Sequence, residues 1–513
     1  MYEAKYKKYI TKSETRFAEL EEVKNCGVKL DKSKKNIGSG VPLCYDENGV
    51  AYIDNEDNHT VIIGPSGCKK TRTAIIPSIN SIINSGESAI ISDPKGELYA
   101  NTALNAEIKG ANVHVLNFRH FNCDSWNPLK PVMDYFKEGN TRLAYQLIND
   151  FVEQIISPNL EKTNDRYWID EAKMLLNAII LILLDSSQNC PELFNIGVIT
   201  QLASENNVEY FKSLHSAMRE DCIASMCLNS VIYMPEKTRA CIFGTLQSCL
   251  EPFTKNEELL SMLSNNNIDI FKLSEEQTII YLIYPDEKTT YNSLINAFLT
   301  QSYEQLVEKA SENCNDRLKI RLNYVLDEFS NLPKIESFEN RISESRSKNI
   351  RYFLCLQSFN QLKAKYDKNA ETIISNCNNW LCYSSKEMEF LTRIAELCGK
   401  EMDYNGNEHY LLNPFEMQHL KKSKESVQVV LIKQGLFPFV SELIDFEYLP
   451  DYRRAKKVIK SNPPSSNKKI SFTAGLWFEL LFNHRLPMPF SEKGGKTKKE
   501  SLIELFDLLD TAK

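Results

Sequence analysis

A short stretch near residue 60 constrains this chain more than any other feature. Residues 60–63 (TVII) are apolar and β-branched, which is typical of a buried strand. A glycine-containing loop, residues 64–71, follows at once, and apolar residues then recur at helical spacing from 74 to 83. Further apolar runs at 88–92 and 113–116 alternate with helical segments. This alternation predicts a mostly parallel sheet with helices on both faces.

The loop itself predicts phosphate binding. Its spacing follows the P-loop pattern G-x-x-x-x-G-K-[ST], in which backbone N–H groups and a helix N-terminus hold phosphates. In that pattern Lys70 neutralises the β- and γ-phosphate oxygens, and the Thr71 hydroxyl holds Mg²⁺. ATP and Mg²⁺ are therefore the expected cofactors. The loop residues are Gly64, Pro65, Ser66, Gly67, Cys68, Lys69, Lys70 and Thr71.

Lys69 departs from the pattern, because the residue before the P-loop lysine is normally glycine. Glycine is used there since it accepts positive φ and lets the backbone approach a ligand closely. A lysine can strain the loop, crowd the phosphates or add a second positive charge. Two other interpretations stay open: a chance match, and a P-loop that has lost nucleotide binding.

A P-loop enzyme also needs a carboxylate on a neighbouring strand. The strand predicted at 323–326 ends in Asp327, which would hold the metal's water shell, and Glu328, which would act as general base toward water. Gln357 follows the next strand and can sense the γ-phosphate or orient water. Arg346 lies between these two strands and can reach a neighbouring subunit's nucleotide as an arginine finger. The alternatives are an ordinary polar turn, a polar residue at a strand end, and a solvated arginine.

The length of 513 residues predicts more than one domain. Strand patterns disappear between 137 and 264, where helical periodicity dominates, and return afterwards. We expect a RecA-like P-loop NTPase of the α/β class whose mostly parallel, twisted sheet carries an inserted all-α domain. The predicted parts are a polar lead-in with short strands (1–55), a discontinuous nucleotide-binding domain (56–136 and 265–455), the insertion (137–264), and a Lys-rich tail with a final helix at 501–509 (456–513).

Composition limits the possible partners and the compartment. The net charge is −7, so any contact with nucleic acid must be a local one, and a basic protein partner fits equally well. The 14 cysteines contain no CxxC pair, which favours free thiols in a reducing compartment. The N-terminus has no signal peptide, and the apolar run 174–184 is too short to span a membrane, so it predicts a buried helix.

Several motifs in order resemble the type IV secretion coupling proteins, the TraG/TraD-like conjugation ATPases. The resemblance covers about residues 35 to 450, and its D-P-K-G-E and L-D-E-F sets are fairly specific to that family. A P-loop by itself is not specific. The motifs are residues 64–71, 92–98 (SDPKGEL), 125–129 (SWNPL), 326–332 (LDEFSNL), 356–358 (LQS) and 361–362 (QL).

The resemblance implies a ring ATPase, usually a homohexamer, related to FtsK-type DNA translocases. Such a protein recruits a relaxase–DNA complex with its single-stranded DNA, or an effector protein, and works with a channel ATPase and a membrane partner of the secretion system. It assigns the Walker A roles to Lys70 and Thr71, the Walker B roles to Asp327 and Glu328, the sensor role to Gln357 and the trans-acting role to Arg346. The segment 137–264 is similar to the family's all-alpha, substrate-receiving domain.

The family's usual pair of N-terminal transmembrane helices has no counterpart in the sequence. We therefore expect a soluble, cytoplasmic variant that is peripheral at the membrane through a partner. Two other functions remain open. Lys69 and the acidic pI also fit a nucleotide-impaired substrate receptor, and the motor elements fit a DNA translocase unrelated to secretion.

Overall fold

The computed structural model describes residues 15–30, 38–121, 123–156, 166–402 and 407–449, together with 477, 478, 481 and 489. The predicted final helix 501–509 lies outside this part of the chain. The molecule has two compact units, which we take in turn. The first consists of residues 1–115, 270–286 and 304–460, and the second of residues 116–269, 287–303 and 461–513.

A nine-stranded sheet forms the core of the first unit, in the order β14-β13-β10-β4-β9-β8-β5-β7-β6. The pairings from β10 through β4, β9, β8 and β5 to β7 are all parallel, whereas β13 pairs antiparallel with both β10 and β14. The predicted mostly parallel sheet is confirmed. The strands are β4 (His59–Ile63), β5 (Ser88–Asp93), β6 (Asn112–Asn117), β7 (Thr278–Ile283), β8 (Leu322–Leu326), β9 (Ile350–Leu356), β10 (Cys377–Cys382), β13 (Ser426–Lys433) and β14 (Phe439–Ile444).

The strand order corrects one expectation. We predicted that the strand bearing the acidic pair would be the neighbour of the P-loop strand. Instead β9 lies between β4 and β8 and pairs with both. Chain order does not reveal this arrangement, because β9 follows β8 in sequence yet is inserted between β8 and β4 in space. The strand β9, which pairs with β4, is therefore followed by Gln357 and not by the acidic pair.

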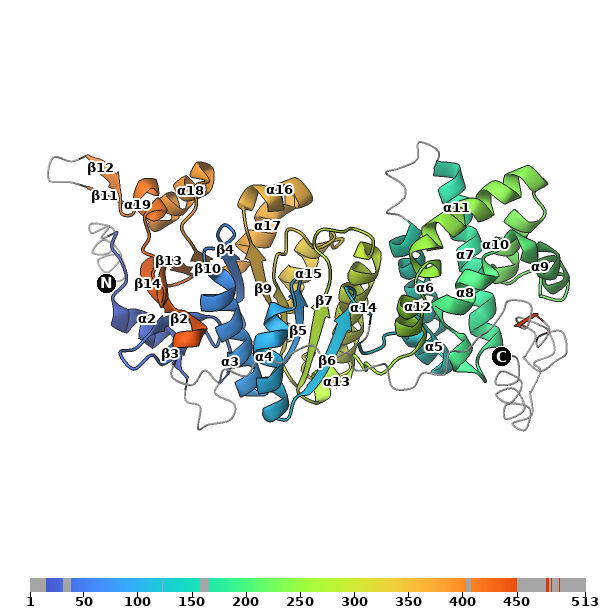
Figure 1. The fold of residues 1–513 in the computed structure, drawn as a ribbon, viewed down its shortest axis with the longest axis horizontal. Coiled ribbons are helices and arrows are strands. Elements are labelled where there is room, and N and C mark those ends of the chain that lie inside the picture. Colours follow the sequence, from blue (N-terminus) through green and yellow to red (C-terminus); the bar gives the residue numbers. More distant parts are fainter. Residues whose placement is uncertain are drawn as a thin grey trace, which may run out of the picture. The chain divides into compact units, whose positions relative to one another are not determined.

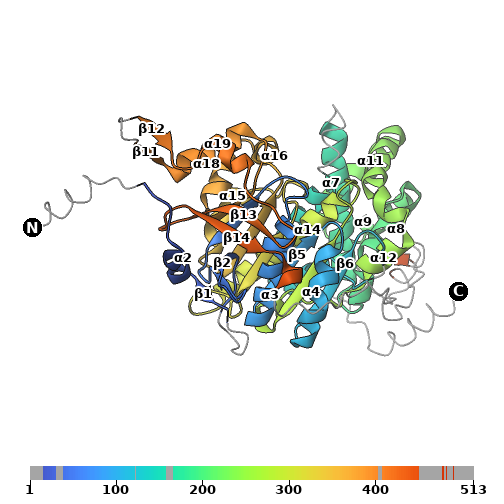
Figure 2. The ribbon, with the colours of Figure 1, turned by 60° about the vertical axis from the view of Figure 1, so that its left-hand side comes forward.

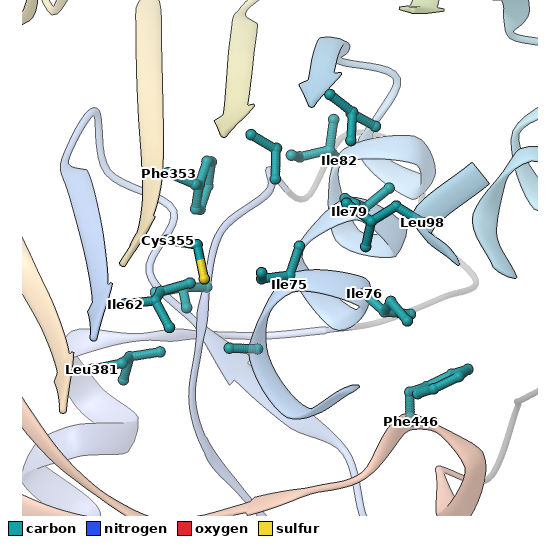
Figure 3. Packing of buried hydrophobic residues seen from close by; sticks show 14 of the residues in the cluster. Ile62, Ile75, Ile76, Ile79, Ile82, Leu98, Phe353, Cys355, Leu381 and Phe446 are labelled. Carbon is teal, nitrogen blue, oxygen red and sulfur yellow. The ribbon is translucent and has the colours of Figure 1, made fainter. Parts of the chain in front are cut away.

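Helices cover both faces of the sheet. In Figure 1 the blue helices α3 (Ile76–Ser85) and α4 (Glu97–Ile108) cover one face. Figure 3 shows Ile75, Ile76, Ile79, Ile82 and Leu98 of this layer packing toward Ile62, Phe353 and Cys355 of the strands. The opposite face carries an aromatic cluster in which Phe338 contacts Phe329, Tyr352 and Tyr366. The helices that follow β8 and β9 are α15 (Phe338–Ser345), α16 (Phe359–Tyr366) and α17 (Asn369–Ser375).

The N-terminal segment contributes the short strands that we expected. β2 (Pro42–Tyr45) and β1 (Val28–Lys29) flank β3 (Ala51–Ile53), next to α2 (Leu20–Cys26). The Ser441 hydroxyl of β14 donates to the Leu43 carbonyl of β2 at 2.6 Å, so this small sheet docks on the antiparallel edge of the large one, as Figure 2 shows. Beyond β10 lie α18 (Met388–Cys398), β11 (Lys400–Met402), β12 (Glu408–Tyr410) and α19 (Pro414–Gln418).

The second unit is helical in its described part. The predicted apolar run lies in α7, where residues 175, 176 and 178–184 are buried, so a buried helix is confirmed. Within the described residues we found no helix with the length and apolar character needed to cross a membrane. The helices of this unit are α5 (Lys130–Lys137), α6 (Thr141–Ile156), α7 (Arg166–Ser186), α8 (Ile196–Leu202), α9 (Val208–His215), α10 (Ile223–Ile232), α11 (Glu236–Thr254), α12 (Glu257–Ser264) and the part of α14 (Asn292–Ser311) up to residue 303, whereas α13 (Lys272–Glu275) belongs to the first unit.

The described fragment of the predicted tail is packed. Trp477 and Phe478 are fully buried, and the Phe478 ring stacks on Tyr210 of α9 with centroids 4.8 Å apart. Phe211 meets the same ring edge-on at 5.3 Å. The Lys-rich composition predicted for the tail from residue 456 onward did not indicate that these aromatic residues would be buried. Large aromatic rings are driven out of water by the area they bury, and here they form part of the helical core.

Candidate nucleotide site

The loop 64–71 leaves β4 at the edge of the sheet where the parallel strands end. The Gly64 N–H donates to the Leu356 carbonyl of β9 at 3.1 Å, which ties the loop to its neighbouring strand. Gly64 is buried, and a Cβ built there would approach the Tyr383 Cβ to 2.5 Å. Only glycine fits this position. Gly67 has φ +78°, the left-handed region that glycine favours, and it faces open space.

Lys69 adopts the backbone conformation that we expected of the missing glycine. Its φ is +77°, which is strained for a residue with a side chain. Its side chain does not crowd the loop. The Lys69 ammonium donates to the Asp445 carboxylate at 3.1 Å, and Asp445 lies on the turn after β14.

Lys70 and Thr71 begin the helical segment that follows the loop. The Lys70 ammonium is buried and donates to the Gly64 carbonyl and, at 3.2 Å, to the Pro65 carbonyl. The Lys70 ammonium is thus bound by carbonyl groups of the loop to which it belongs. Thr71 opens a π-helical turn, Thr71–Ile75, that leads into α3. Such turns are rare and frequently occur at functional sites.

The predicted acidic pair lies at the end of β8. Burial, and then the neighbouring Glu328 carboxylate, raise the pKa of Asp327 to about 7, while the nearby Lys70 ammonium opposes this shift. The Glu328 N–H donates to Asp327 Oδ1 at 3.0 Å. Glu328 has φ +51°, so its backbone is strained.

Gln357 joins this group as predicted. Its side-chain amide donates to Glu328 Oε2 at 2.6 Å. The bond holds one oxygen of the candidate general base and orients the carboxylate. Lys70, Asp327, Glu328 and Gln357 therefore lie together, although they come from three different strand ends.

Arg346 lies elsewhere. It directly follows α15 and precedes β9, so it is at the opposite, amino-terminal edge of the parallel strands. It is exposed, and its charge helps, after burial, to lower the pKa of His59 to about 4 at the start of β4. The fold does not bring Arg346 to the loop of its own chain. Its role toward a neighbouring subunit stays a prediction.

Our sequence reasoning missed three residues at this edge. Asp93, which ends β5 inside the D-P-K-G-E motif, had no assigned role, and burial raises its pKa to about 6. The Tyr383 hydroxyl hydrogen bonds with Thr73 at 2.7 Å beneath the loop. Asp445 pairs with Lys69. Position at the end of a strand pattern was a usable signal for Asp93 and Tyr383, but no such signal marked Asp445, and the sequence does not show that it lies next to the loop.

The residues present fit a nucleotide with Mg²⁺. Thr71 and Asp327 supply hydroxyl and carboxylate oxygens, the donors that Mg²⁺ prefers together with phosphate oxygens. Asp327 is a buried acid whose raised pKa reflects incomplete neutralisation, so a cation beside it is favourable. Among the described residues no group of three or more His, Cys, Asp and Glu could hold a metal by itself. The Mg²⁺ site stays a prediction.

Comparison with known proteins gives a consistent result. A family model described as Type IV secretory system Conjugative DNA transfer matches residues 7–403. The Escherichia coli conjugal transfer protein TraG is 23% identical over 360 residues, which cover 67% of this chain and 55% of TraG. Protein VirD4 of Rhizobium radiobacter is 21% identical over 492 residues, covering 90% of this chain and 65% of VirD4. The chain thus spans less than two thirds of the length of these curated relatives.

Solved structures of similar fold include the plasmid coupling protein TrwB. Its complex with the non-hydrolysable GTP analogue GDPNP has a TM-score of 0.57 at 14% identity, covering 84% of this chain and 93% of that one. Its complex with ADP and Mg²⁺ has a TM-score of 0.55 at 13% identity, covering 85% and 94%. These likenesses confirm the predicted RecA-like P-loop fold with an all-α insertion.

Proposed function

Since the chain belongs to the Type IV secretory system Conjugative DNA transfer family, we propose that it is an ATP-driven coupling protein. It recruits a relaxase–DNA complex or a protein substrate and delivers it to a type IV secretion channel. This function is a proposal and does not follow from family membership by itself. The relatives are longer than this chain and only distantly similar to it, so their whole activity cannot simply be transferred.

One observation supports the motor function above all others. Lys70, Asp327, Glu328 and Gln357 meet at the carboxyl edge of the sheet, and the Gln357 amide holds the Glu328 carboxylate at 2.6 Å. Ligands of open α/β sheets bind at this edge. A cation, a buried carboxylate, a second carboxylate and its orienting amide are the parts that phosphoryl transfer to water requires.

Each side chain has a distinct task in this proposal. The loop N–H groups and the Lys70 ammonium bind the phosphate oxygens, for which Lys70 exchanges its carbonyl partners Gly64 and Pro65. Glu328 takes a proton from the attacking water, and Gln357 keeps its carboxylate aimed at that water. Thr71 and Asp327 would hold Mg²⁺, which when bound neutralises charge on the phosphates. ADP and Mg²⁺ in the structurally similar TrwB complex support this assignment.

The partners follow from family membership rather than from the site. The helices of the insertion would receive the relaxase–DNA complex or effector, and single-stranded DNA would be contacted locally, because the net charge of the whole chain is −7. A homohexamer would place Arg346 of one subunit near the nucleotide of the next. We place the protein in the cytoplasm, at the membrane surface through a membrane partner, with the channel ATPase of the secretion system as a further partner.

ATP hydrolysis in the presence and absence of single-stranded DNA tests the proposal. Glu328→Gln should abolish hydrolysis while nucleotide binding persists, because the carboxylate acts on water and does not hold the phosphates. Glu336→Gln, at an exposed glutamate on the same loop, is the matched control and should behave like the unaltered protein. If the unaltered protein neither hydrolyses nor binds ATP, the motor proposal fails and a nucleotide-impaired substrate receptor, which Lys69 also fits, takes its place.

A further inference from the structure

Lys69 and the turn after β14 form a charge cluster beside the loop. Asp445 is 1% exposed and receives three hydrogen bonds from cationic side chains. Lys69 Nζ donates at 3.1 Å, Arg72 Nε at 2.7 Å to the same oxygen, and Arg72 Nη2 at 2.9 Å to the other. Lys69 Nζ also donates to the Lys424 carbonyl at 2.5 Å. The Lys69 ammonium is therefore held by two partners outside the loop.

The antiparallel edge of the sheet brings these residues together. Ser426, which begins β13, pairs with Ile444, which ends β14, so the segments 421–425 and 445–447 lie at the same edge as the loop. From the first segment Lys422 donates to the Gly67 carbonyl at 2.7 Å. In the second, Phe446 packs in the core with Ile76, as Figure 3 shows. The turn that holds Asp445 is thus anchored in the core, and it can fix the loop.

The electrostatics favour an ionised, paired Asp445. Burial acts to raise the pKa of this carboxyl, but the hydrogen bonds from Arg72 and Lys69 outweigh burial and hold the pKa below its usual range. The two arginine bonds form a bidentate pair, which fixes the position of the carboxylate. The fixed carboxylate thereby holds the Lys69 ammonium in one position. Lys69 itself has a φ of +77°, which is unfavourable for a residue with a side chain.

We propose that the Lys69–Asp445 pair takes the place of the usual P-loop glycine, and that Asp445 is a positioning residue for nucleotide binding. The pair offsets the cost of the left-handed backbone and carries the Lys69 side chain away from the loop interior, where Lys70 is held. The N–H groups of the loop then stay directed at the phosphates. This inference rests on the proposed nucleotide-binding function of the same loop.

A double-mutant cycle tests the pair, with dissociation constants measured for a non-hydrolysable ATP analogue plus Mg²⁺. Asp445→Asn should weaken binding about tenfold in the native background. In the Lys69→Gly background the same change should cost less than about threefold, because glycine adopts positive φ without a partner. Glu442→Gln is the matched control, since it neutralises an exposed carboxylate of the same hairpin that accepts a hydrogen bond from the Ser426 hydroxyl, and it should bind as the native chain does. An equal loss from Asp445→Asn in both backgrounds overturns the proposal.

Lys69→Met removes the lysine partner of the pair and leaves Asp445 bonded to Arg72. It therefore tests the pair even if Asp445→Asn does not fold. It keeps a side chain at positive φ but removes the charge. We expect it to weaken binding about tenfold while Lys69→Gly binds as the native chain does. Equal affinities for the two variants would contradict the role of the pair.

Hydrogen exchange of residues 64–71 without nucleotide separates this inference from the proposed function. Loss of the pair should speed exchange in the native background but not in the Lys69→Gly background. If the native protein binds no analogue, the proposed function fails, and this exchange pattern still supports the pair. Exchange that Asp445→Asn leaves unchanged in the native background overturns it.

Discussion

Asp327 and Asp93, at the carboxyl edge of the sheet, differ from Asp54 and Asp57, at its amino edge, in the direction in which their pKa values are shifted. At the carboxyl edge, burial raises the pKa of Asp327 to about 7 and that of Asp93 to about 6. At the amino edge Asp54 is also buried, which acts to raise its pKa, yet Lys433 and two asparagine amides hold the pKa below its usual range. Asp57 is likewise lowered, by Arg317 and Arg321 against the effect of burial.

The charged groups at the amino edge are paired with one another inside the chain, and this pairing stabilises the fold. Lys433 donates to Asp54 at 3.2 Å, and Arg351, 2% exposed, donates to the Ser39 carbonyl at 2.8 Å and pairs with Glu87. These groups tie the segments before the strands to the sheet. Asp93 and Asp327 at the carboxyl edge lack comparable neutralisation, which costs stability and suits a cation and phosphates, whereas Asp445 at that edge is paired with Lys69 and Arg72. Perturbed acids of this kind mark candidate functional sites.

The largest expected effect comes from Asp327→Asn. It should lower the rate of ATP hydrolysis by about 100- to 1,000-fold, because a held metal ion supplies several kcal/mol of transition-state stabilisation. The same change removes a poorly neutralised buried charge, so the free energy of unfolding without nucleotide should not fall. Steady-state kinetics and urea unfolding measure both quantities. Retained hydrolysis would show that the carboxyl edge is not the catalytic one.

The same substitution at the other edge should do the reverse. Asp54→Asn leaves the nearly buried Lys433 with only the Glu56 carboxylate, at 3.0 Å. Breaking a buried pair in this way should lower the free energy of unfolding by roughly 2–3 kcal/mol. Nucleotide affinity at pH 8 should change little, as a binding titration would reveal. An unchanged urea midpoint would remove the distinction between the two edges.

The pH dependence of stability should also differ between the edges. Because the folded pKa of Asp327 is raised from 3.8 to about 7, the folded state binds the extra proton, and stability falls as pH rises through that window. Asp54 has a lowered pKa, so its contribution is present above its ordinary value and is lost on acidification. Between pH 5 and pH 8 the native chain should lose roughly 1–3 kcal/mol relative to Asp327→Asn. A flat difference would contradict the raised pKa.

The smallest expected effect is that of Gln357→Ala. Loss of the amide that orients Glu328 should lower kcat several-fold, by roughly 1 kcal/mol of transition-state stabilisation, and leave KM unchanged. Gln361→Ala, at an exposed glutamine of α16, is the matched control. A change in KM alone would assign Gln357 to nucleotide binding instead of orientation.

Much of the fold could be predicted because it depends on local pattern. The apolar run at residue 60 is β4, the run at 278–283 is β7, and the helical periodicity after residue 141 is α6 and α7. β14 was missed, because it lies at the edge of the sheet, where Glu442 is exposed and the residues are only partly apolar. A strand with one solvated side carries a weaker pattern than one buried on both faces.

Candidate site residues could be named from the sequence, and their roles stay predictions. Lys70, Asp327, Glu328 and Gln357 each follow an apolar strand or belong to the loop pattern, so their candidacy was predictable from residue type and spacing. The order of β4, β9 and β8 was not, since spatial neighbours in a parallel sheet need not be neighbours in sequence.

The sequence by itself determined the residue pattern: a loop with the spacing of phosphate-binding loops, acids at strand ends, and a lysine where glycine was expected. Only the tertiary structure decided what that lysine does. Asp445 lies far from Lys69 in sequence, and the antiparallel hairpin β13–β14 returns it to the edge of the sheet where the loop begins. Local pattern specifies backbone conformation, but the partner of a charged side chain depends on which distant segments the packed core brings together.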